Sequence, residues 1–226
     1  TLSQPTGQAL PTIYIDLVGE RIALPGFILR QGRVRGKLVN LANSPSQLII
    51  NAEGLDVAGQ TFQKVNATFN GTEQSHVLDL DIANEQLSVL ARLKGGFNRD
   101  QLIWRGAIGN GSIQSEYATL NQLQPAQLVL NLPQGDSNPL KVQLAAHCWQ
   151  AADQSGKLCL RENLIASPDR GQVDLAIQNL DTSLFSVFLP NDIDWQAKIN
   201  GKAILGWQKG RAPSINTTLY SDNGKI

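Results

Sequence analysis

The sequence of 226 residues has few of the side chains that catalytic and metal sites need. It contains two histidines, two cysteines and no methionine, and its 19 acidic residues balance its 19 basic ones. A net charge of zero disfavours non-specific binding to nucleic acid or to an anionic surface. No run of about 18 apolar residues is present, so the sequence predicts no membrane-spanning helix. Gly-x-Ser-x-Gly, Walker and Gly-x-Gly-x-x-Gly motifs are also missing. We therefore expect no enzyme activity, no catalytic residue, no cofactor and no metal.

Charged residues make up 17% of the chain, below the roughly 25% of an average soluble domain. Asn, Gln, Ser and Thr take the outward positions instead, and this composition favours a location outside the cytoplasm. Because a natural precursor begins with Met, a chain without Met is expected to be a segment of a longer polypeptide. We expect residues 1–226 to form one continuous segment of it.

The strongest positive feature is an alternation of apolar and polar residues. From Ile193 to Trp207, apolar residues hold one parity and polar residues the other. Side chains on a strand point alternately to opposite faces, so the pattern predicts a long β-strand with one apolar face. The pattern recurs between clusters of Gly, Asn, Asp and Pro, and short connections predict antiparallel neighbours. The predicted strands are Thr12–Val18, Arg33–Asn40, Gln47–Ala52, Thr61–Asn70, Gln74–Ala83, Gln86–Lys94, Gln101–Ile108, Gly111–Thr119, Ala126–Leu132, Leu140–Trp149, Leu158–Leu160, Gln172–Asn179, Ile193–Gln208 and Ser214–Ser221.

Turn residues separate several of these strands, and one helix is expected. Asn70-Gly71, Gly109-Asn110-Gly111 and Asp136 to Pro139 predict hairpin turns, because these residue types adopt positive φ or initiate turns. A short helix near 181–189 is predicted by Asp181 as its cap and by Pro190 as its end. Leu184, Phe185 and Phe188 would form its apolar stripe.

The inward parity of each strand gives the candidate functional residues. They are Leu78, Leu80, Ile82, Leu87, Val89, Leu93, Leu102, Trp104, Ile108, Leu128, Leu130, Leu144, Val173, Leu175, Ile177, Trp195, Ile199, Leu205 and Trp207. These residues can form the core of an ordinary β-sandwich. They can equally line an open, curled sheet that accepts acyl chains. The alternation alone does not separate the two interpretations.

Polar residues that resemble a site have a simpler interpretation. His76 and His147 are predicted on the faces opposite the apolar series, as isolated surface imidazoles rather than metal ligands. Asp79 and Asp81 share a strand face at about 6.6–6.8 Å, a spacing that suits glycoside hydrolysis or calcium but is more common on a solvated face. The basic row of Arg33, Arg35 and Lys37 is predicted to protect an edge strand.

The two cysteines bracket a turn-rich segment. Cys148 and Cys159 flank residues 150–157, which include Asp153-Gln154-Ser155-Gly156. Across a hairpin they can form a disulfide, and closing a loop of about 12 residues stabilises by roughly 3 kcal/mol on the chain-entropy estimate. This spacing without further Cys or clustered His is a poor zinc site. We expect a disulfide, and hence an oxidising compartment.

This hairpin resembles a known family. His147-Cys148-Trp149, followed by Leu158-Cys159-Leu160, resembles the Cys-Trp and Leu-Cys-Leu signature of the TamB family, which belongs to the AsmA-like, bridge-like lipid-transfer proteins. The segments 179–184 and 188–190 are similar to that family's short helix and its Leu-Pro stop, and residues 199–203 to the Gly-x-Ala strand that follows. Leu87 to Leu93, Gly95-Gly96 and Trp104-Arg105-Gly106 resemble the family's repeat of a Leu-rich segment, Gly-Gly and Trp-x-Gly. The resemblance covers about residues 30–220.

The resemblance implies a fold and a function. It implies an elongated, curled antiparallel sheet that forms an open hydrophobic groove, a half-pipe or β-taco, here from a middle-to-C-terminal periplasmic segment. An N-terminal helix missing from this chain would anchor the full protein in the inner membrane. The groove would shield acyl chains and conduct phospholipid between the inner and outer membranes, supporting outer-membrane integrity, protein assembly and secretion. A TamA-like outer-membrane barrel protein would be its partner.

Two other functions compete with the lipid conduit. One is a scaffold or chaperone for outer-membrane β-barrel proteins, which would pair exposed strand edges with a client or with a TamA-like partner. The other is a carbohydrate-active or adhesin-like sandwich, for which aromatic platforms and clustered carboxylates are expected. The aromatic residues are few and lie mainly at inward positions, which disfavours the sandwich.

Overall fold

The computed structural model describes residues 12–24, 27–38, 44–57, 60–116, 118–134, 138–182 and 196–225. Within these ranges the chain forms eighteen β-strands that belong to one sheet, and no α-helix. The predicted all-β, antiparallel class is confirmed. The strands are β1 (Ile13–Gly19), β2 (Ile22–Leu24), β3 (Phe27–Leu38), β4 (Ser46–Val57), β5 (Gln60–Phe62), β6 (Lys64–Gly71), β7 (His76–Ala83), β8 (Leu87–Asn98), β9 (Ile103–Ser115), β10 (Thr119–Gln122), β11 (Ala126–Asn131), β12 (Lys141–Leu144), β13 (His147–Ala151), β14 (Lys157–Leu160), β15 (Leu164–Ala166), β16 (Arg170–Asp181), β17 (Gln196–Gln208) and β18 (Ser214–Lys225).

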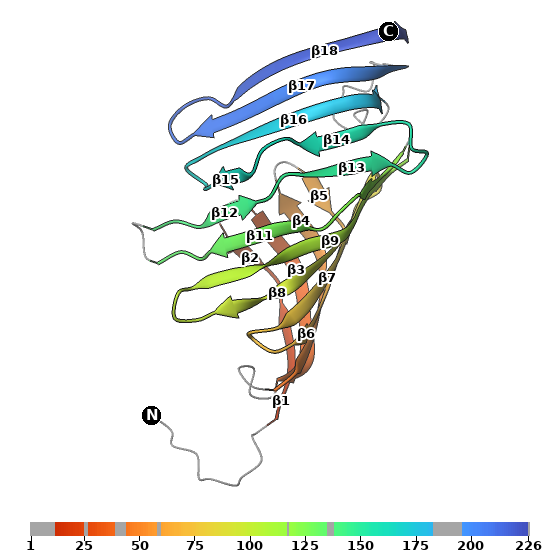
Figure 1. The fold of residues 1–226 in the computed structure, drawn as a ribbon. Helices are drawn as coiled ribbons and strands as arrows, with labels where there is room; N and C mark the ends of the chain where they lie inside the picture. Colours follow the sequence, from red (N-terminus) through yellow and green to blue (C-terminus); the bar gives the residue numbers. More distant parts are fainter. Residues whose placement is uncertain are drawn as a thin grey trace.

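The sheet is an antiparallel meander in which each pass of the chain pairs with the pass before it and with the pass after it. Several short strands share one pass of the chain across the sheet, as β10 and β11 both pair with β9. In the next two passes, β12 and β13 pair with β11 and β10, and β15 and β14 pair with β12 and β13. Figure 1 shows the strands stacked in chain order from β1 at one end to β18 at the other.

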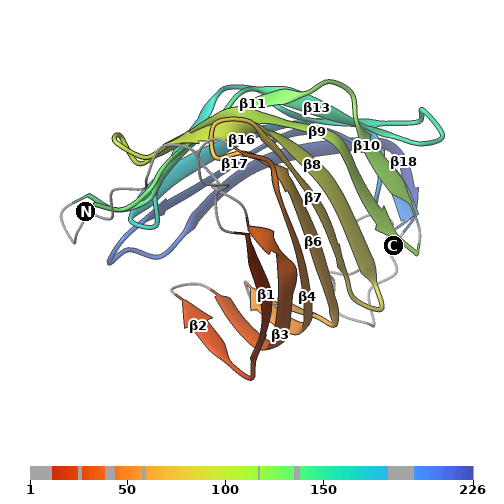
Figure 2. The ribbon, with the colours of Figure 1, turned by 90° about the horizontal axis from the view of Figure 1, so that it is seen from below.

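The sheet curves strongly but does not close. Figure 2, viewed along the stack, shows the strands bent into an open trough with β1 to β3 on one side and β16 to β18 on the other. No pairing joins β18 to β1 or β2 among the described strands, which pair instead with β17 and with β3. The curled, open sheet agrees with the predicted fold class.

Local turn chemistry explains where the hairpins form. The β6–β7 turn is closed by Thr72, whose hydroxyl accepts from the Ser75 N–H at 3.1 Å. In the β7–β8 turn, the Asn84 side chain accepts from the N–H of Leu87 at 2.6 Å. Such side chains replace the backbone partners that a turn removes. The turn expected at Asn70-Gly71 thus lies one to two residues later.

Two predictions about strands are corrected. Gly109 to Gly111 form no hairpin, because β9 continues through them with a bulge at Asn110, whose φ is 51°. Bulges insert one residue without ending a strand, so a turn-like sequence was misinterpreted. The basic row of Arg33, Arg35 and Lys37 guards no edge, because β3 pairs with β1 on one side and β4 on the other.

The predicted helix near 181–189 falls almost entirely outside the described residues. Asp181, the predicted cap, is the last residue of β16, where it pairs with Lys198. Thr182 follows it and is fully buried, with its hydroxyl donating to the Ala197 carbonyl at 3.1 Å. The same oxygen accepts from the Ala197 N–H at 2.9 Å, which fixes the end of β16 against β17.

Candidate functional site

The registers place the apolar residues of successive strands side by side on one face, which we call the inner face. Residues directly opposite in an antiparallel pair lie on the same side of the sheet, so a chain of such pairs forms a ladder across it. The first ladder crosses eight strands: Ile15, Gly36, Leu48, Phe69, Leu78, Leu93, Ile108 and Ala126. The second crosses nine: Gly19, Gly32, Ala52, Val65, Ile82, Val89, Ile113, Leu120 and Ala151.

Two further ladders extend the inner face to β18. One consists of Trp149, Leu158, Ile177, Gly201 and Leu219, and the other of His147, Leu160, Leu175, Ala203 and Thr217. None of the four ladders contains Asp, Glu, Lys or Arg. An uninterrupted, uncharged surface therefore runs across the sheet from its first strands to its last.

Most inner-face side chains are only partly covered. In β8, Val89, Leu93 and Phe97 are half-buried, whereas the intervening Leu90, Arg92 and Lys94 are exposed. The whole chain exposes 14742 Å², while a compact protein of this size exposes about 10,000 Å². A closed sandwich would bury both inner sheets against each other. The inner face is therefore an open apolar surface and not the core of a sandwich.

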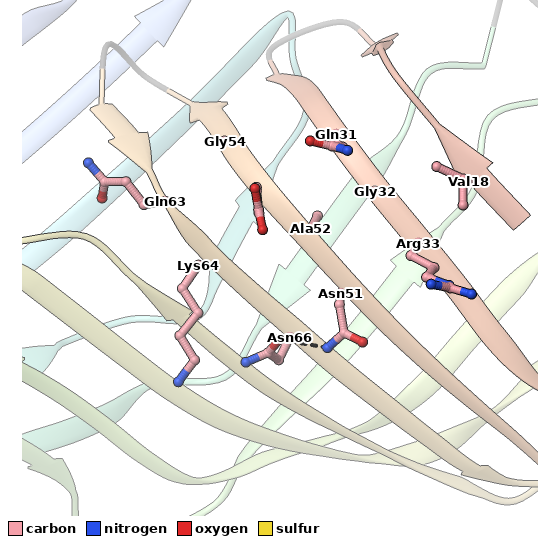
Figure 3. Close-up of a pocket in the computed structure, with 11 residues that line it drawn as sticks. Val18, Gln31, Gly32, Arg33, Asn51, Ala52, Gly54, Gln63, Lys64 and Asn66 are labelled. Atoms are coloured by element: carbon pink, nitrogen blue, oxygen red, sulfur yellow. Dashed lines mark hydrogen bonds between the residues drawn. The ribbon is translucent and has the colours of Figure 1, made fainter.

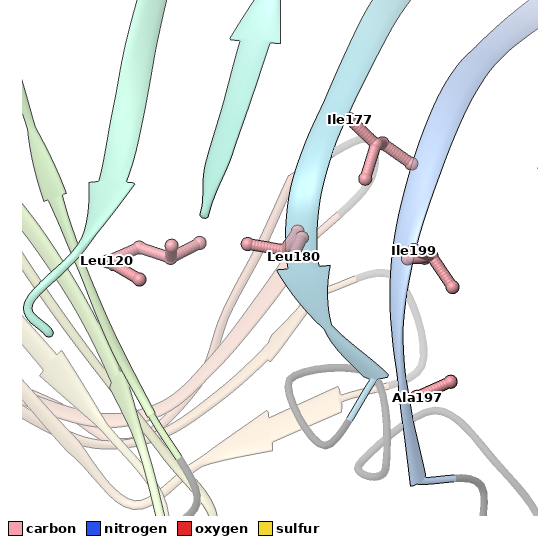
Figure 4. Close-up of a cluster of buried hydrophobic side chains, with 6 residues drawn as sticks. Leu120, Ile177, Leu180, Ala197 and Ile199 are labelled. Carbon is pink, nitrogen blue, oxygen red and sulfur yellow. The ribbon is translucent and has the colours of Figure 1, made fainter. Parts of the chain in front are cut away.

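One end of the inner face is packed, because side chains from six strands meet there. The buried cluster contains Leu120, Ala151, Ile177, Leu180, Ala197 and Ile199, with Ile113, Trp149 and Leu158 against it. Figure 4 shows Leu120 and Leu180 extending toward one another. Leu180 and Ile199 are 1% and 2% exposed. These residues hold the curvature of the sheet, and packing removes Ile177 and Ile199 from the accessible part of the inner face.

Tryptophans on the inner face are held by polar partners. The Trp104 Nε1–H donates to His76 Nε2 at 2.8 Å, and the Trp207 Nε1–H donates to the Ser167 carbonyl at 3.0 Å. His76 Nδ1 lies 2.9 Å from the Thr72 carbonyl, so this hydrogen-bond network assigns the proton to Nδ1. Both indole N–H groups are thus satisfied, as buried polar groups require.

Both histidines were assigned to the wrong face. His76 has the same parity as Leu78 in β7, and its ring packs on Phe69 at 4.8 Å between centroids. His147 is 9% exposed and pairs with Leu160, because the break between β12 and β13 shifts the parity by one residue. Each ring has a backbone carbonyl within 2.9 Å, and these bonds allow an imidazole on an apolar face.

Charged residues gather on the opposite, outer face in ion pairs. Asp79 contacts Arg92 at 2.7 Å and Asp81 contacts Lys64 at 2.5 Å, which confirms a solvated face for both carboxylates. Arg33 contacts Asp16 at 2.5 Å, and its hydrogen bonds hold the pKa of that carboxyl below its usual value. Such exposed pairs contribute little to stability, because water screens them. They keep the outer face wetted by water.

The outer face also carries a shallow polar depression of about 810 Å³ across β1 to β6. Figure 3 shows that amide and charged side chains line it, with Asn51 donating to Asn66 at 2.8 Å. Its lining residues are Val18, Gln31, Gly32, Arg33, Asn51, Ala52, Glu53, Gly54, Gln63, Lys64 and Asn66. Arg33 and Lys64 are already paired with carboxylates, so the depression presents little unbalanced charge.

Cys148 and Cys159 lie directly opposite one another in β13 and β14, with 4.0 Å between their Cα atoms, and are joined by a disulfide. Their parity is opposite to that of His147 and Trp149, so the bond lies on the outer face. It links two short strands beside the breaks at 145–146 and 161–163 and leaves the apolar surface unobstructed.

The structure places nearly all the candidate residues in paired inner-face positions, with two exceptions. Leu102 lies in the turn before β9, where its φ is 52°, and not in a strand. Trp195 lies outside the described residues. Sequence reasoning missed the contribution of the first strands, including Val34, Leu48 and Ile50. Their alternation in the printed sequence was a sufficient signal.

A side chain in the middle of the sheet supports the β9 bulge. The Gln122 amide donates to the Ile108 carbonyl at 3.0 Å and accepts from the Gly111 N–H at 3.2 Å. These are backbone groups that a bulge leaves without a ladder partner. Gln122 is thus a polar residue at an inner-face position with a structural reason to be there.

The described part of the chain lacks two further features. No helix within the described ranges is long and apolar enough to cross a membrane. No group of three or more His, Cys, Asp and Glu side chains lies close enough to hold a metal ion in the same part of the chain.

Comparison with known proteins identifies the family. The family described as TamB, N-terminal domain, matches residues 7–226. The translocation and assembly module subunit TamB of Haemophilus influenzae is 26% identical over 144 residues, which are 63% of this chain and 11% of that protein. No solved structure matches the chain. The matching family describes the N-terminal domain, whereas the motifs led us to expect a middle-to-C-terminal segment. With nearly its whole length matched, this chain belongs to the TamB family.

Proposed function

We propose that this chain is a periplasmic segment of a TamB-like protein and that its inner face conducts phospholipid acyl chains between membranes. The observation that carries the proposal is the inner face itself. Its four ladders contain no charged residue, and most of its side chains are only partly covered. Exposed apolar patches of this extent are uncommon on soluble proteins and mark binding surfaces. Acyl chains need only apolar contact, so no catalytic group takes part and the segment is not an enzyme.

The dimensions favour a path over a pocket. At about 4.8 Å between strands, a ladder across nine strands extends roughly 38 Å. A single acyl chain occupies about 15 Å, half of the hydrocarbon thickness of a bilayer. The surface is therefore longer than the lipid that it would hold. Since apolar burial stabilises by about 25 cal/mol per Å² without directional bonds, a chain can slide from strand to strand at nearly constant free energy.

The polar headgroup would remain outside the trough. None of the ladders offers a charged partner for a phosphate, and the trough is open on one side (Figure 2). In the full-length protein, we propose an inner-membrane anchor and a TamA-like outer-membrane partner at its ends. The name of the Haemophilus influenzae relative, a subunit of a translocation and assembly module, supports an assembly with such a partner.

A second candidate function is a scaffold for outer-membrane proteins. The observation that favours it is the last strand, β18, which has 12 residues and pairs only with β17 among the described strands. Its Ile215 and Tyr220 are 70% and 61% exposed. A long edge with little charge is a surface to which a client strand can add by backbone hydrogen bonds.

Lipid bound to the purified full-length protein tests the conduit. We expect mass spectrometry to detect phospholipid on the wild-type protein and much less on a Leu93→Asp variant, because an unpaired carboxylate on an apolar surface costs several kcal/mol to desolvate. Lys94→Asp is the matched control, since it places the same charge one residue away on the outer face.

The control should retain the wild-type amount of phospholipid. A wild-type protein without phospholipid, or equal losses in the two variants, would contradict the conduit. Retained client binding in the absence of phospholipid would favour the scaffold.

A further inference from the structure

Three inner-face tryptophans lie against glycines, and the contacts leave no room for a larger residue. A Cβ atom on Gly171 would lie 2.7 Å from Cε2 of Trp207, and closer still to two other atoms of the same ring. A Cβ on Gly111 would lie 2.5 Å from Cη2 of Trp149. Trp104 lies in the same way over Gly95 and Gly106, at 2.6 Å and 2.5 Å from the corresponding Cβ positions.

The glycines allow the indoles to lie close to the backbone. Carbon atoms in contact are normally about 3.5–4.0 Å apart, so a methyl group at Gly171 would displace the Trp207 ring by at least about 1 Å. A hydrogen bond from the Trp207 Nε1–H to the Ser167 carbonyl, at 3.0 Å, holds the indole ring close to the backbone. Gly171 and Trp207 are direct cross-strand partners in β16 and β17.

Backbone conformation does not explain glycine at these places. Gly171 and Gly111 have no positive φ in the left-handed range, unlike Gly201 at 150° and Gly54 at 78°. Glycine within a strand weakens it, because it has no side chain to pack and loses more entropy on folding. At Gly171 the three nearest atoms all belong to Trp207. Glycine at position 171 therefore allows the Trp207 ring to occupy this position.

Resting on the proposed conduit, we infer that these glycines recess the tryptophans and so set the depth of the acyl path. A tryptophan is the largest side chain, and one that stands upright on the inner face would obstruct a lipid that crosses it. An indole that lies flat over a glycine adds apolar surface to the inner face and does not project into the lipid path. Trp207 and its glycine partner are therefore positioning residues for transport.

The test compares variants of the full-length protein in cells, each with a photo-crosslinking residue at Leu205, beside Trp207 on the inner face. Gly171→Ala is expected to reduce the yield of phospholipid adduct severalfold. Gly206→Ala is the matched control on the outer face of β17, where the new methyl would meet the Ser214 hydroxyl at 2.9 Å and the Gly171 carbonyl oxygen at 3.9 Å, and no tryptophan ring. The double variant Gly171→Ala with Trp207→Leu should recover the adduct, since leucine removes the obstructing ring.

Each outcome supports or overturns the inference. Loss of adduct in Gly171→Ala with recovery in the double variant supports it, and recovery also shows that the alanine backbone folds. An unchanged yield in Gly171→Ala, or a loss that Trp207→Leu fails to restore, overturns it while leaving the conduit intact. A wild-type protein that gives no phospholipid adduct at Leu205 overturns the conduit itself, and the inference with it.

Discussion

Truncation of inner-face leucines should cost very different amounts of stability at the two kinds of position. Leu180 is 1% exposed and packs within the buried cluster, so Leu180→Ala removes contacts and leaves a cavity. Such changes cost about 3–5 kcal/mol. Leu205 is only half-buried and is not part of that cluster. Leu205→Ala should lose part of the transfer free energy of a leucine, about 1 kcal/mol, and create no cavity.

Urea unfolding of the purified 226-residue chain, followed by circular dichroism, measures the difference. With a slope of about 2 kcal/mol per molar urea, Leu180→Ala should lower the midpoint by roughly 2 M and Leu205→Ala by roughly 0.5 M. Equal decreases near the larger value would show that Leu205 is packed as tightly as Leu180. The inner face would then be a filled core and not an open surface.

Two further predictions concern the covalent and polar supports of the sheet. The unreduced, denatured protein from an oxidising compartment should contain no reactive thiol, because Cys148 and Cys159 are joined, and two thiols in a colorimetric titration would refute the bond. Gln122→Leu should destabilise by about 1–3 kcal/mol, since it leaves backbone groups of the β9 bulge unpaired, whereas Gln114→Leu on the exposed face should stay within about 0.5 kcal/mol. Equal urea midpoints for these two variants would show that the bulge does not depend on Gln122.

Strand periodicity predicted the class of the fold and most of its apolar face. A period of two is a local property, so residues such as Leu78, Leu80 and Ile82 could be assigned to one face without knowledge of their neighbours. The same reasoning assigned Asp79 and Asp81 of β7 to the opposite face. These assignments needed no information about the way the strands pair.

Features that depend on pairing were beyond this reasoning. The bulge at Asn110 looks like a turn in the sequence, because the same residue types adopt positive φ in both. The break before His147 shifts the parity of the strand by one residue, so alternation alone predicted the wrong face for this histidine. Whether β3 is an edge depends on β1, which pairs with it from 17 residues away at Asp16 and Arg33. The openness of the inner face is likewise a property of the whole sheet.

Photo-crosslinking at adjacent residues of one strand tests the central claim most directly. Leu93 and Lys94 are adjacent in β8 but point to opposite faces of the sheet. A crosslinker at Leu93 in the full-length protein should trap phospholipid in cells, and one at Lys94 should trap little or none. Equal phospholipid adducts at both positions, or none at either, would contradict the account of the inner face as an acyl path.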